Sequence, residues 1–285
     1  MSGSSVRFGI KVAQMGGTYA EMREAWLEAD RLGFDTAWAH DHLLNQTDPS
    51  RAEDEGWTVL TALLVQSRRI RGGLMVTANT FRHPAVLAKI ASATDVVSAG
   101  RLEVGLGAGW FETEHHQYGL PLPPLGERMR RLDEACAVLR ALWTEPRATF
   151  EGVHYQIREA FHEPKPVQRP HPPIVIGTSG ERVGLRIVAR HAQEWNMAKG
   201  TPAEFRRRSA LLDTYCREVG RDPATVARSI QFLPEAMDGD AAILAARARE
   251  FVAAGATHLI FSCPMPYTAA GARWLWQEVV PRVRG

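Results

Sequence analysis

Two histidines and an aspartate stand together in the segment AHDH, residues 39–42. His40 and His42 are two positions apart, so on a strand their side chains point to the same side. An imidazole titrates near neutral pH and suits proton transfer or the stabilisation of an anion. A metal site is the alternative, but it normally needs three protein ligands, and the only nearby supplement is EHH at 114–116, in a predicted loop or helix start. We therefore expect one catalytic imidazole, His42, and no metal, with His40 either facing the same pocket or bonded to backbone in the core.

Glycine-rich segments follow two apolar stretches elsewhere in the chain. GTSG at 177–180 places two hydroxyls and two glycines before a predicted helix, where free N–H groups can bind an anion. A plain helix cap by Ser179 is the alternative. GLGAG at 105–109 is only a fragment of a dinucleotide fingerprint, because no acidic residue follows at the end of the next strand. Neither segment has the spacing of a Walker A loop.

Short β-prone segments and amphipathic helical segments alternate along the whole chain of 285 residues. Strands are predicted at 6–12, 35–42, 70–79, 101–109, 173–178, 194–198, 227–236 and 257–263. Helices are predicted at 19–33, 57–68, 84–98, 127–143, 180–191, 202–219, 240–254 and 268–282. Eight such units predict an α/β fold, a single (β/α)8 TIM barrel over 1–285, rather than a doubly wound open sheet. The proline-rich segment 144–172 is an insertion before strand 5 and is predicted to lack regular structure.

The active site of such a barrel lies at the carboxyl ends of its strands. The polar and glycine-rich segments described above fall there. The predicted rim residues, in strand order, are Gln14, Asp41, His42, Ala78, Asn79, Ala108 to Trp110, Thr178 to Gly180, Asn196, Met197, Glu235 and Cys263.

Composition excludes several other classes of protein. The formal net charge is only +2, so no basic field favours nucleic acid. The 3 cysteines are far apart and form no CxxC motif, which gives neither a zinc site nor a disulfide framework. No apolar run has the length of a membrane span or a secretion signal, so we expect a cytoplasmic protein.

Together these segments resemble the luciferase-like superfamily of flavin and deazaflavin oxidoreductases. The resemblance is closest to its actinobacterial branch, which uses coenzyme F420. It is carried by 35–43, 73–119, 126–146 and 150–196, about half of the chain and in the order of the family. Some members have a tryptophan soon after the Asp-His pair, or a glutamate where this chain has Trp110, so the resemblance implies no particular substrate.

The resemblance implies roles for individual residues. The Asp-His pair that ends the second strand matches Asp41 and His42, and the histidine of that pair assists the hydride step. The third strand of the family often carries a non-prolyl cis peptide bond behind the ring, which falls here at Met75–Val76. The implied cofactor-binding residues are Met75, Val76, Thr77 and Asn79 beside the ring, Ala108, Gly109 and Trp110 along it, and Thr178, Ser179 and Gly180 at its phosphate.

The resemblance also implies that GLGAG at 105–109 is a strand whose glycines allow a ring or phosphate chain to approach. Trp110 would then pack on the cofactor or at the entrance of its site. The acidic tail of F420 would need basic partners. The candidates are Lys165, Arg169, Arg182 and Lys199.

The implied function is that of an F420-dependent oxidoreductase that transfers a hydride between the deazaflavin and a small organic substrate. His42 would donate a proton or stabilise charge on the ring, and Asp41 would orient His42 or bond the cofactor. The alternatives are an FMN-dependent luciferase-like monooxygenase with a separate reductase, a metal-dependent hydrolase on the same barrel, and a non-catalytic carrier. The family commonly dimerises through helices near strands 2 and 3, so we expect a homodimer with no nucleic-acid or membrane partner.

Overall fold

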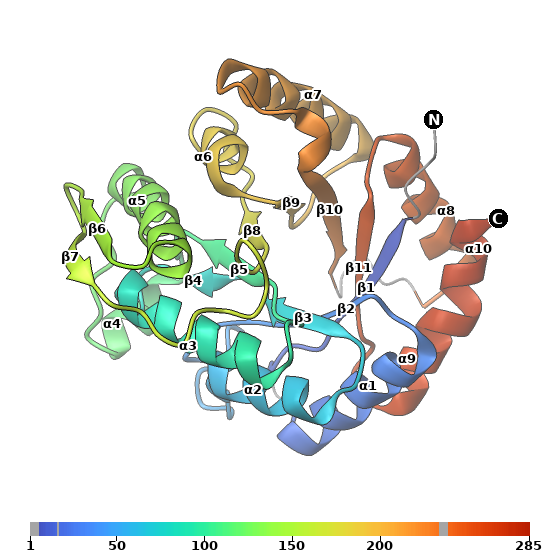
Figure 1. The fold of residues 1–285 in the computed structure, drawn as a ribbon. Helices are drawn as coiled ribbons and strands as arrows, with labels where there is room; N and C mark the ends of the chain where they lie inside the picture. The colour runs from blue at the N-terminus through green and yellow to red at the C-terminus, as the bar shows by residue number, and fades with distance from the viewer. Residues whose placement is uncertain (1–5, 16, 234–238) are drawn as a thin grey trace.

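The computed structural model describes residues 6–15, 17–233 and 239–285, and its helices lie outside its strands (Figure 1). The main sheet consists of β1 (Arg7–Lys11), β2 (Thr36–Ala39), β3 (Arg71–Leu74), β4 (Thr77–Ala78), β5 (Val104–Gly107), β8 (Ile174–Gly177), β9 (Glu194–Met197), β10 (Ala227–Phe232) and β11 (His258–Ser262). The helices are α1 (Tyr19–Leu32), α2 (Gly56–Gln66), α3 (Pro84–Val97), α4 (Glu112–Gln117), α5 (Leu125–Thr144), α6 (Gly184–His191), α7 (Pro202–Glu218), α8 (Ala241–Ala253), α9 (Ala269–Trp274) and α10 (Val280–Arg284). A 3-10 turn at Pro223–Thr225 precedes β10, and a π-helical turn at Leu275–Val279 joins α9 to α10.

The strands of the main sheet run parallel in the order β3-β2-β1-β11-β10-β9-β8-β5-β4. β3 and β4 are the two halves of one predicted strand, interrupted at Met75 and Val76. A parallel bridge from Gly72 in β3 to Leu102 joins the two ends of this order. The sheet therefore closes into an eight-stranded barrel, which confirms the predicted fold.

Local signals in the sequence begin and end the helices. Thr18 and Glu21 form a reciprocal capping box at the start of α1, and Gly33 ends that helix with a φ of 116°. Thr201 and Glu204 form the same capping box at the start of α7. None of the helices in the described ranges is long and apolar enough to span a membrane.

Two apolar clusters hold the barrel together. The large cluster lies between the sheet and the helices, where the indoles of Trp26, Trp143 and Trp195 are fully buried. A small cluster inside the barrel contains Trp38 and Met75 together with Val175 and Ile260. The alternation of side chains along each strand supplies both clusters, since every second residue faces the lumen.

The predicted loop at 144–172 is wrong in its first half, although its place before the fifth barrel strand (β8) is as predicted. β6 (Ala148–Glu151) and β7 (Gln156–Ala160) form an antiparallel hairpin there, which stands beside α5 (Figure 1). Pro146 precedes the hairpin and the other prolines of the segment follow residue 162, so none of them interrupts β6 or β7. The predicted strand 227–236 ends at Phe232, and the rim candidate Glu235 lies outside the described residues.

Candidate active site

His42 follows β2 at the carboxyl end of the barrel, and its partner is a glutamate from α4. The Nδ1 atom of His42 lies 3.0 Å from Oε1 and 3.2 Å from Oε2 of Glu114. The Glu114 side chain is only 1% exposed, whereas that of His42 is 13% exposed. An ionised carboxylate can only accept hydrogen bonds, so Nδ1 carries the ring proton. Nε2 is then the nitrogen that could exchange a proton with a ligand.

Asp41 does not orient His42. Both of its carboxylate oxygens bind the guanidinium of Arg82, at 2.6 and 2.9 Å, and Oδ2 also accepts the backbone N–H of Ala78 in β4. Burial raises the pKa of the Asp41 carboxyl, against the opposing effect of Arg82. The aspartate next to the histidine therefore joins the end of β2 to the β4 segment, and it is Glu114 that orients the ring.

A second histidine holds α4 in the place that Glu114 requires. His115 Nδ1 donates to the carbonyl of Phe111 at 2.7 Å, so its Nε2 is free to accept from the Thr80 hydroxyl, also at 2.7 Å. Thr80 lies two residues after the end of β4. His115 thus links α4 to the barrel rim.

The peptide bond between Met75 and Val76 is cis, as the resemblance implied. Glycines on the neighbouring strands make room for this bulge. A Cβ on Gly107 would lie 2.5 Å from a Val76 methyl, and one on Gly177 would lie 2.9 Å from the other methyl. Gly107 thus accommodates the Val76 side chain, and it also lines the cavity described next.

A cavity of about 970 Å³ opens beside this bulge. Its apolar wall includes Val76, Leu125 and Met129, and its polar wall includes the hydroxyl-bearing segment 178–180. Two guanidinium groups, those of Arg130 and Arg182, line it as well. The size and this combination of side chains suit an organic ring that carries a phosphate.

Trp110 lies between this cavity and His42. Its side chain is 62% exposed and lines the cavity. Its ring centroid lies 5.9 Å from that of His42, with the two rings edge to face at 79°. Trp110 therefore contacts both the cavity and the His42 ring, whereas His42 itself is not among the residues that line the cavity.

The cavity contains most, but not all, of the predicted cofactor-binding residues. Val76, Ala108, Gly109, Trp110, Thr178, Ser179 and Gly180 line it. Met75 instead packs inside the barrel. Thr77 is buried in β4, and the Asn79 amide bonds the Tyr155 hydroxyl of the hairpin at 3.3 Å. Neither of these two side chains is among the residues that line the cavity.

The segment after β8 is a turn rather than an immediate helix start. Thr178 Oγ1 accepts the backbone N–H of Gly180, and α6 begins only at Gly184. The predicted helix 180–191 therefore starts four residues late, and Ser179 is not its cap, because the residue before the helix is Val183. The turn places 178–184 along the cavity wall.

Of the four predicted basic partners, only Arg182 lines the cavity. The ammonium of Lys165 bonds the carbonyls of Leu142 and Glu145, and Arg169 bonds that of Pro166. Lys199 is exposed beyond the end of β9 and does not line the cavity either. Arg130 from α5 was not predicted, because its place in a run of basic residues made it resemble a solvated helix face.

His40 is buried, and its Nε2 lies 2.5 Å from Oε1 of Glu53. Of the two alternatives for His40, a place in the pocket or a place in the core, the structure therefore shows the core. The hydrogen-bond partner of its ring is a side chain and not the backbone. Across residues 6–15, 17–233 and 239–285, no group of three or more His, Cys, Asp or Glu side chains is placed to hold a metal ion.

Sequence reasoning missed the carboxylates that bind the two histidines. Glu114 lies in the short helix α4 and Glu53 in the loop before α2, and nothing local in the sequence marks either as the partner of a histidine. The available signal for Glu114 was the cluster EHH at 114–116, which was weighed as a metal site and as a loop or helix start. Arg82 was equally unmarked, because one arginine among many has no distinguishing pattern.

Comparisons with known proteins agree with this architecture. The model of the luciferase-like monooxygenase family matches residues 2–278. An F420-dependent glucose-6-phosphate dehydrogenase of Microbacterium testaceum is 31% identical over 219 residues, which cover 76% of this chain and 64% of that protein. An FMNH(2)-dependent dimethylsulfone monooxygenase of Pseudomonas putida is 30% identical over 152 residues, which cover 53% of this chain and 41% of that one.

Solved structures share the fold at low sequence identity. An F420-dependent secondary alcohol dehydrogenase, solved with an F420-acetone adduct, superposes with a TM-score of 0.86 at 18% identity. The superposition covers 99% of this chain and 100% of that one. Because the family model spans nearly the whole sequence, the chain belongs to the luciferase-like monooxygenase family.

Proposed function

We propose that this chain is an oxidoreductase that transfers a hydride between coenzyme F420 and a small organic substrate. The observation that carries the proposal is the position of Trp110. It lines the 970 Å³ cavity, and its ring also packs edge to face against that of His42. The relative from Microbacterium testaceum and the structural neighbour that uses F420 support the choice of cofactor.

The residues of the cavity fit a ring with a phosphate. Val76 and the 107–110 segment would support the ring, and 178–180 with Arg130 and Arg182 would attract the anionic part. When bound, the deazaflavin supplies or accepts the hydride. The protein would bind and orient the cofactor and the substrate, and Trp110 would exclude water from its side of the cavity.

His42 would handle the proton. Its Nδ1–H is held by Glu114, which fixes the ring and stabilises the imidazolium when Nε2 takes a proton. Nε2 can then give a proton to a substrate oxygen or accept one from it, according to the direction of hydride transfer. Asp41 acts as an anchor for the rim through Arg82 and does not exchange protons.

Titration of the purified protein with F420 and with FMN, followed by fluorescence, tests this proposal. We expect saturable F420 binding that weakens in Arg182→Met, with Arg206→Met on the outer face of α7 as the matched control. Binding of FMN without F420 would replace the proposal by the second candidate below. Binding of neither would remove the cavity as a cofactor site.

The second candidate is a monooxygenase that takes reduced FMN from a separate reductase. It is favoured by the relative from Pseudomonas putida, whose name specifies FMNH(2). FMN also carries a ring and a phosphate, so the same cavity walls would hold it. The titration separates the two, since only F420 has a long acidic tail.

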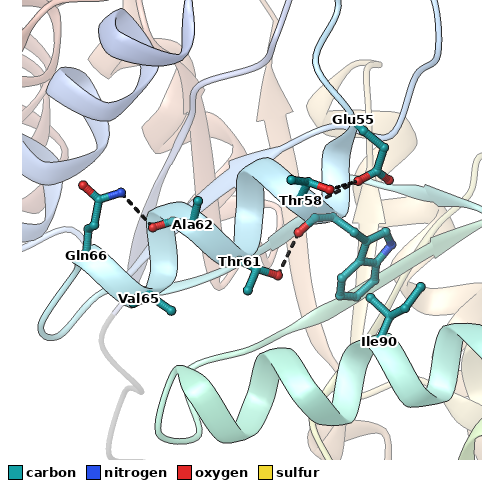
Figure 2. A pocket seen from close by; sticks show the side chains of 8 residues that line it. Glu55, Thr58, Thr61, Ala62, Val65, Gln66 and Ile90 are labelled. Carbon is teal, nitrogen blue, oxygen red and sulfur yellow. Dashed lines mark hydrogen bonds between the residues drawn. The ribbon is translucent and has the colours of Figure 1, made fainter.

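We infer further that two copies associate through α2 and α3. These helices form a groove of about 720 Å³ with an apolar floor that includes Trp57, Ala62 and Ile90 (Figure 2). Val65 and Val86 on the same helices are each 55% exposed. A second copy is the occupant that the family resemblance implies, and contiguous exposed apolar surface is typical of an interface. The cytoplasmic location, the single domain and the lack of a nucleic-acid or membrane partner stay predictions.

A further inference from the structure

A second buried carboxyl and imidazole lie beside His42. Glu53 Oε1 is 2.5 Å from Nε2 of His40, and the two side chains are only 2% and 4% exposed. The ring of His40 packs against that of His42, with centroids 5.0 Å apart and planes at 79°. The proposed function uses neither Glu53 nor His40.

The protonation of this pair follows from its burial. Two ionised groups in an apolar environment lose their hydration, and a single pairwise attraction only partly replaces it. A protonated carboxyl that donates to a neutral imidazole places one proton between the two atoms and leaves no net or separated charge. His40 would then accept at Nε2 and carry its own proton on Nδ1.

We propose that Glu53 and His40 are a positioning pair for His42: below its titration midpoint Glu53 keeps its proton and donates a hydrogen bond to His40 Nε2, and the uncharged pair supports the His42 ring. When Glu53 loses its proton, its carboxylate requires a donor, so the His40 proton moves from Nδ1 to Nε2. A negative charge and an altered ring dipole then lie next to His42. The proton balance is one proton lost to solvent and one shifted within His40.

The charged groups around Glu53 and His40 favour the neutral form of both side chains. Burial raises the pKa of Glu53 to about 7, and the negative charges of Asp54 and Glu114 add to the rise. Burial lowers the pKa of His40 well below 6.5, and the positive charges of His42 and Lys11 add to the fall. The contact with the Asn45 side chain opposes the rise for Glu53. The Tyr267 phenol also lies near enough to interact with Glu53.

The first test needs neither cofactor nor substrate. In protein labelled with ¹³C at the glutamate carboxyls and ¹⁵N at the histidine rings, we expect one carboxyl signal to titrate near pH 7. That signal should vanish in Glu53→Gln. The His40 ring should show the Nδ1–H tautomer at pH 6 and the Nε2–H tautomer at pH 8.5, and the His42 ring signals should move at the same midpoint. Asp54→Asn, which removes an exposed neighbouring carboxyl, should retain all of these changes with a midpoint at lower pH, because the charge of Asp54 adds to the rise in the pKa of Glu53.

The second test rests on the proposed function, because it follows turnover. Glu53→Gln keeps a donor to His40 Nε2, so we expect kcat at pH 6 within about twofold of wild type, with the pH dependence near pH 7 lost. Glu53→Ala removes the donor and should lower kcat at every pH. If no substrate turns over, the proposed function fails, and the spectra still decide the state of the pair.

Three results would overturn the inference. A Glu53 carboxyl that titrates near pH 4.5 would mean an ion pair instead of a neutral one. A His40 ring that stays in one tautomer from pH 6 to 8.5 would exclude the proton shift. His42 signals that move identically in wild type and Glu53→Gln would show that the pair does not act on His42.

Discussion

The Nδ1 atom of His42 lies 3.0 Å from Oε1 of Glu114, although 72 residues separate the two in the chain. The same glutamate also accepts the backbone N–H of Leu43, so it fixes both the ring and the backbone that follows it. A carboxylate that holds Nδ1 selects the tautomer in which Nε2 faces a ligand. The position and tautomer of His42 are thus set by Glu114 of α4 and not by Asp41, its neighbour in the sequence.

Substitution of His42 or of its partner Glu114 should lower the rate of turnover more than it weakens cofactor binding. We expect His42→Ala to lower kcat by about 10²–10⁴-fold and Glu114→Gln by about 10-fold or more, since a neutral amide cannot stabilise the imidazolium. The affinity for F420 should change little in either variant. Glu112→Gln on the exposed face of the same helix is the control, and stopped-flow turnover with reduced F420 is the measurement. Unchanged turnover in His42→Ala would remove its catalytic role.

The Asp41 and Arg82 pair should dominate the stability of the rim. The Arg82 guanidinium makes three hydrogen bonds to carboxylates, two to Asp41 and one to Glu55. Asp41→Asn removes the negative charge behind two of them, so the free energy of unfolding should fall by about 3 kcal/mol. Urea unfolding measures this change. Asp54→Asn, at an exposed position, should shift the free energy by less than about 0.5 kcal/mol. Equal effects of the two substitutions would contradict the anchor role.

Gly105 should tolerate no side chain. A Cβ at this position would lie 1.9 Å from the carbonyl oxygen of Leu74, which is backbone and cannot move aside as a side chain can. We expect Gly105→Ala to lower the free energy of unfolding by about 3 kcal/mol or to prevent folding. Gly126→Ala in α5 is the control, since its Cβ would meet only an arginine nitrogen at 3.6 Å. A thermal melt of both variants gives the comparison.

Stability should depend on pH through Glu53. Its pKa rises from 4.5 in the unfolded chain to about 7 in the folded protein. Between those values the folded state binds more protons than the unfolded state, so stability falls as pH rises through this window. Relative to wild type, Glu53→Gln should therefore gain about 2 kcal/mol in free energy of unfolding between pH 5 and pH 8. Parallel urea midpoints for the two proteins over this range would contradict a raised pKa.

The oligomeric state should respond to a charge on α2. Val65→Asp places a carboxylate beside the apolar groove, and we expect a shift from dimer to monomer in light scattering at micromolar protein concentration. Val153→Asp on the hairpin is the matched control, because Val153 is 87% exposed and lies outside the groove. A wild-type monomer at these concentrations would refute the homodimer.

The barrel could be predicted from local patterns in the sequence. Apolar periodicity, capping residues such as Thr18 and Gly33, and strict alternation all operate over one or two helical turns, so they can be recognised without a structure. Asp41 and His42 were recognisable for the same reason, since both lie at the end of one predicted strand. The family resemblance added the position of the cis bond, which no local pattern predicts.

Only the tertiary structure decided which side chains act together. Closure of the barrel brings α4 to the end of β2 and the 53–55 segment to the strand before His42, and it pairs Asp41 with Arg82 rather than with the histidine. A carboxylate has the same local sequence signature whether it faces solvent or a buried imidazole. Its partner depends on contacts between residues that lie 13, 41 and 72 positions apart in the chain, and those contacts exist only in the folded protein.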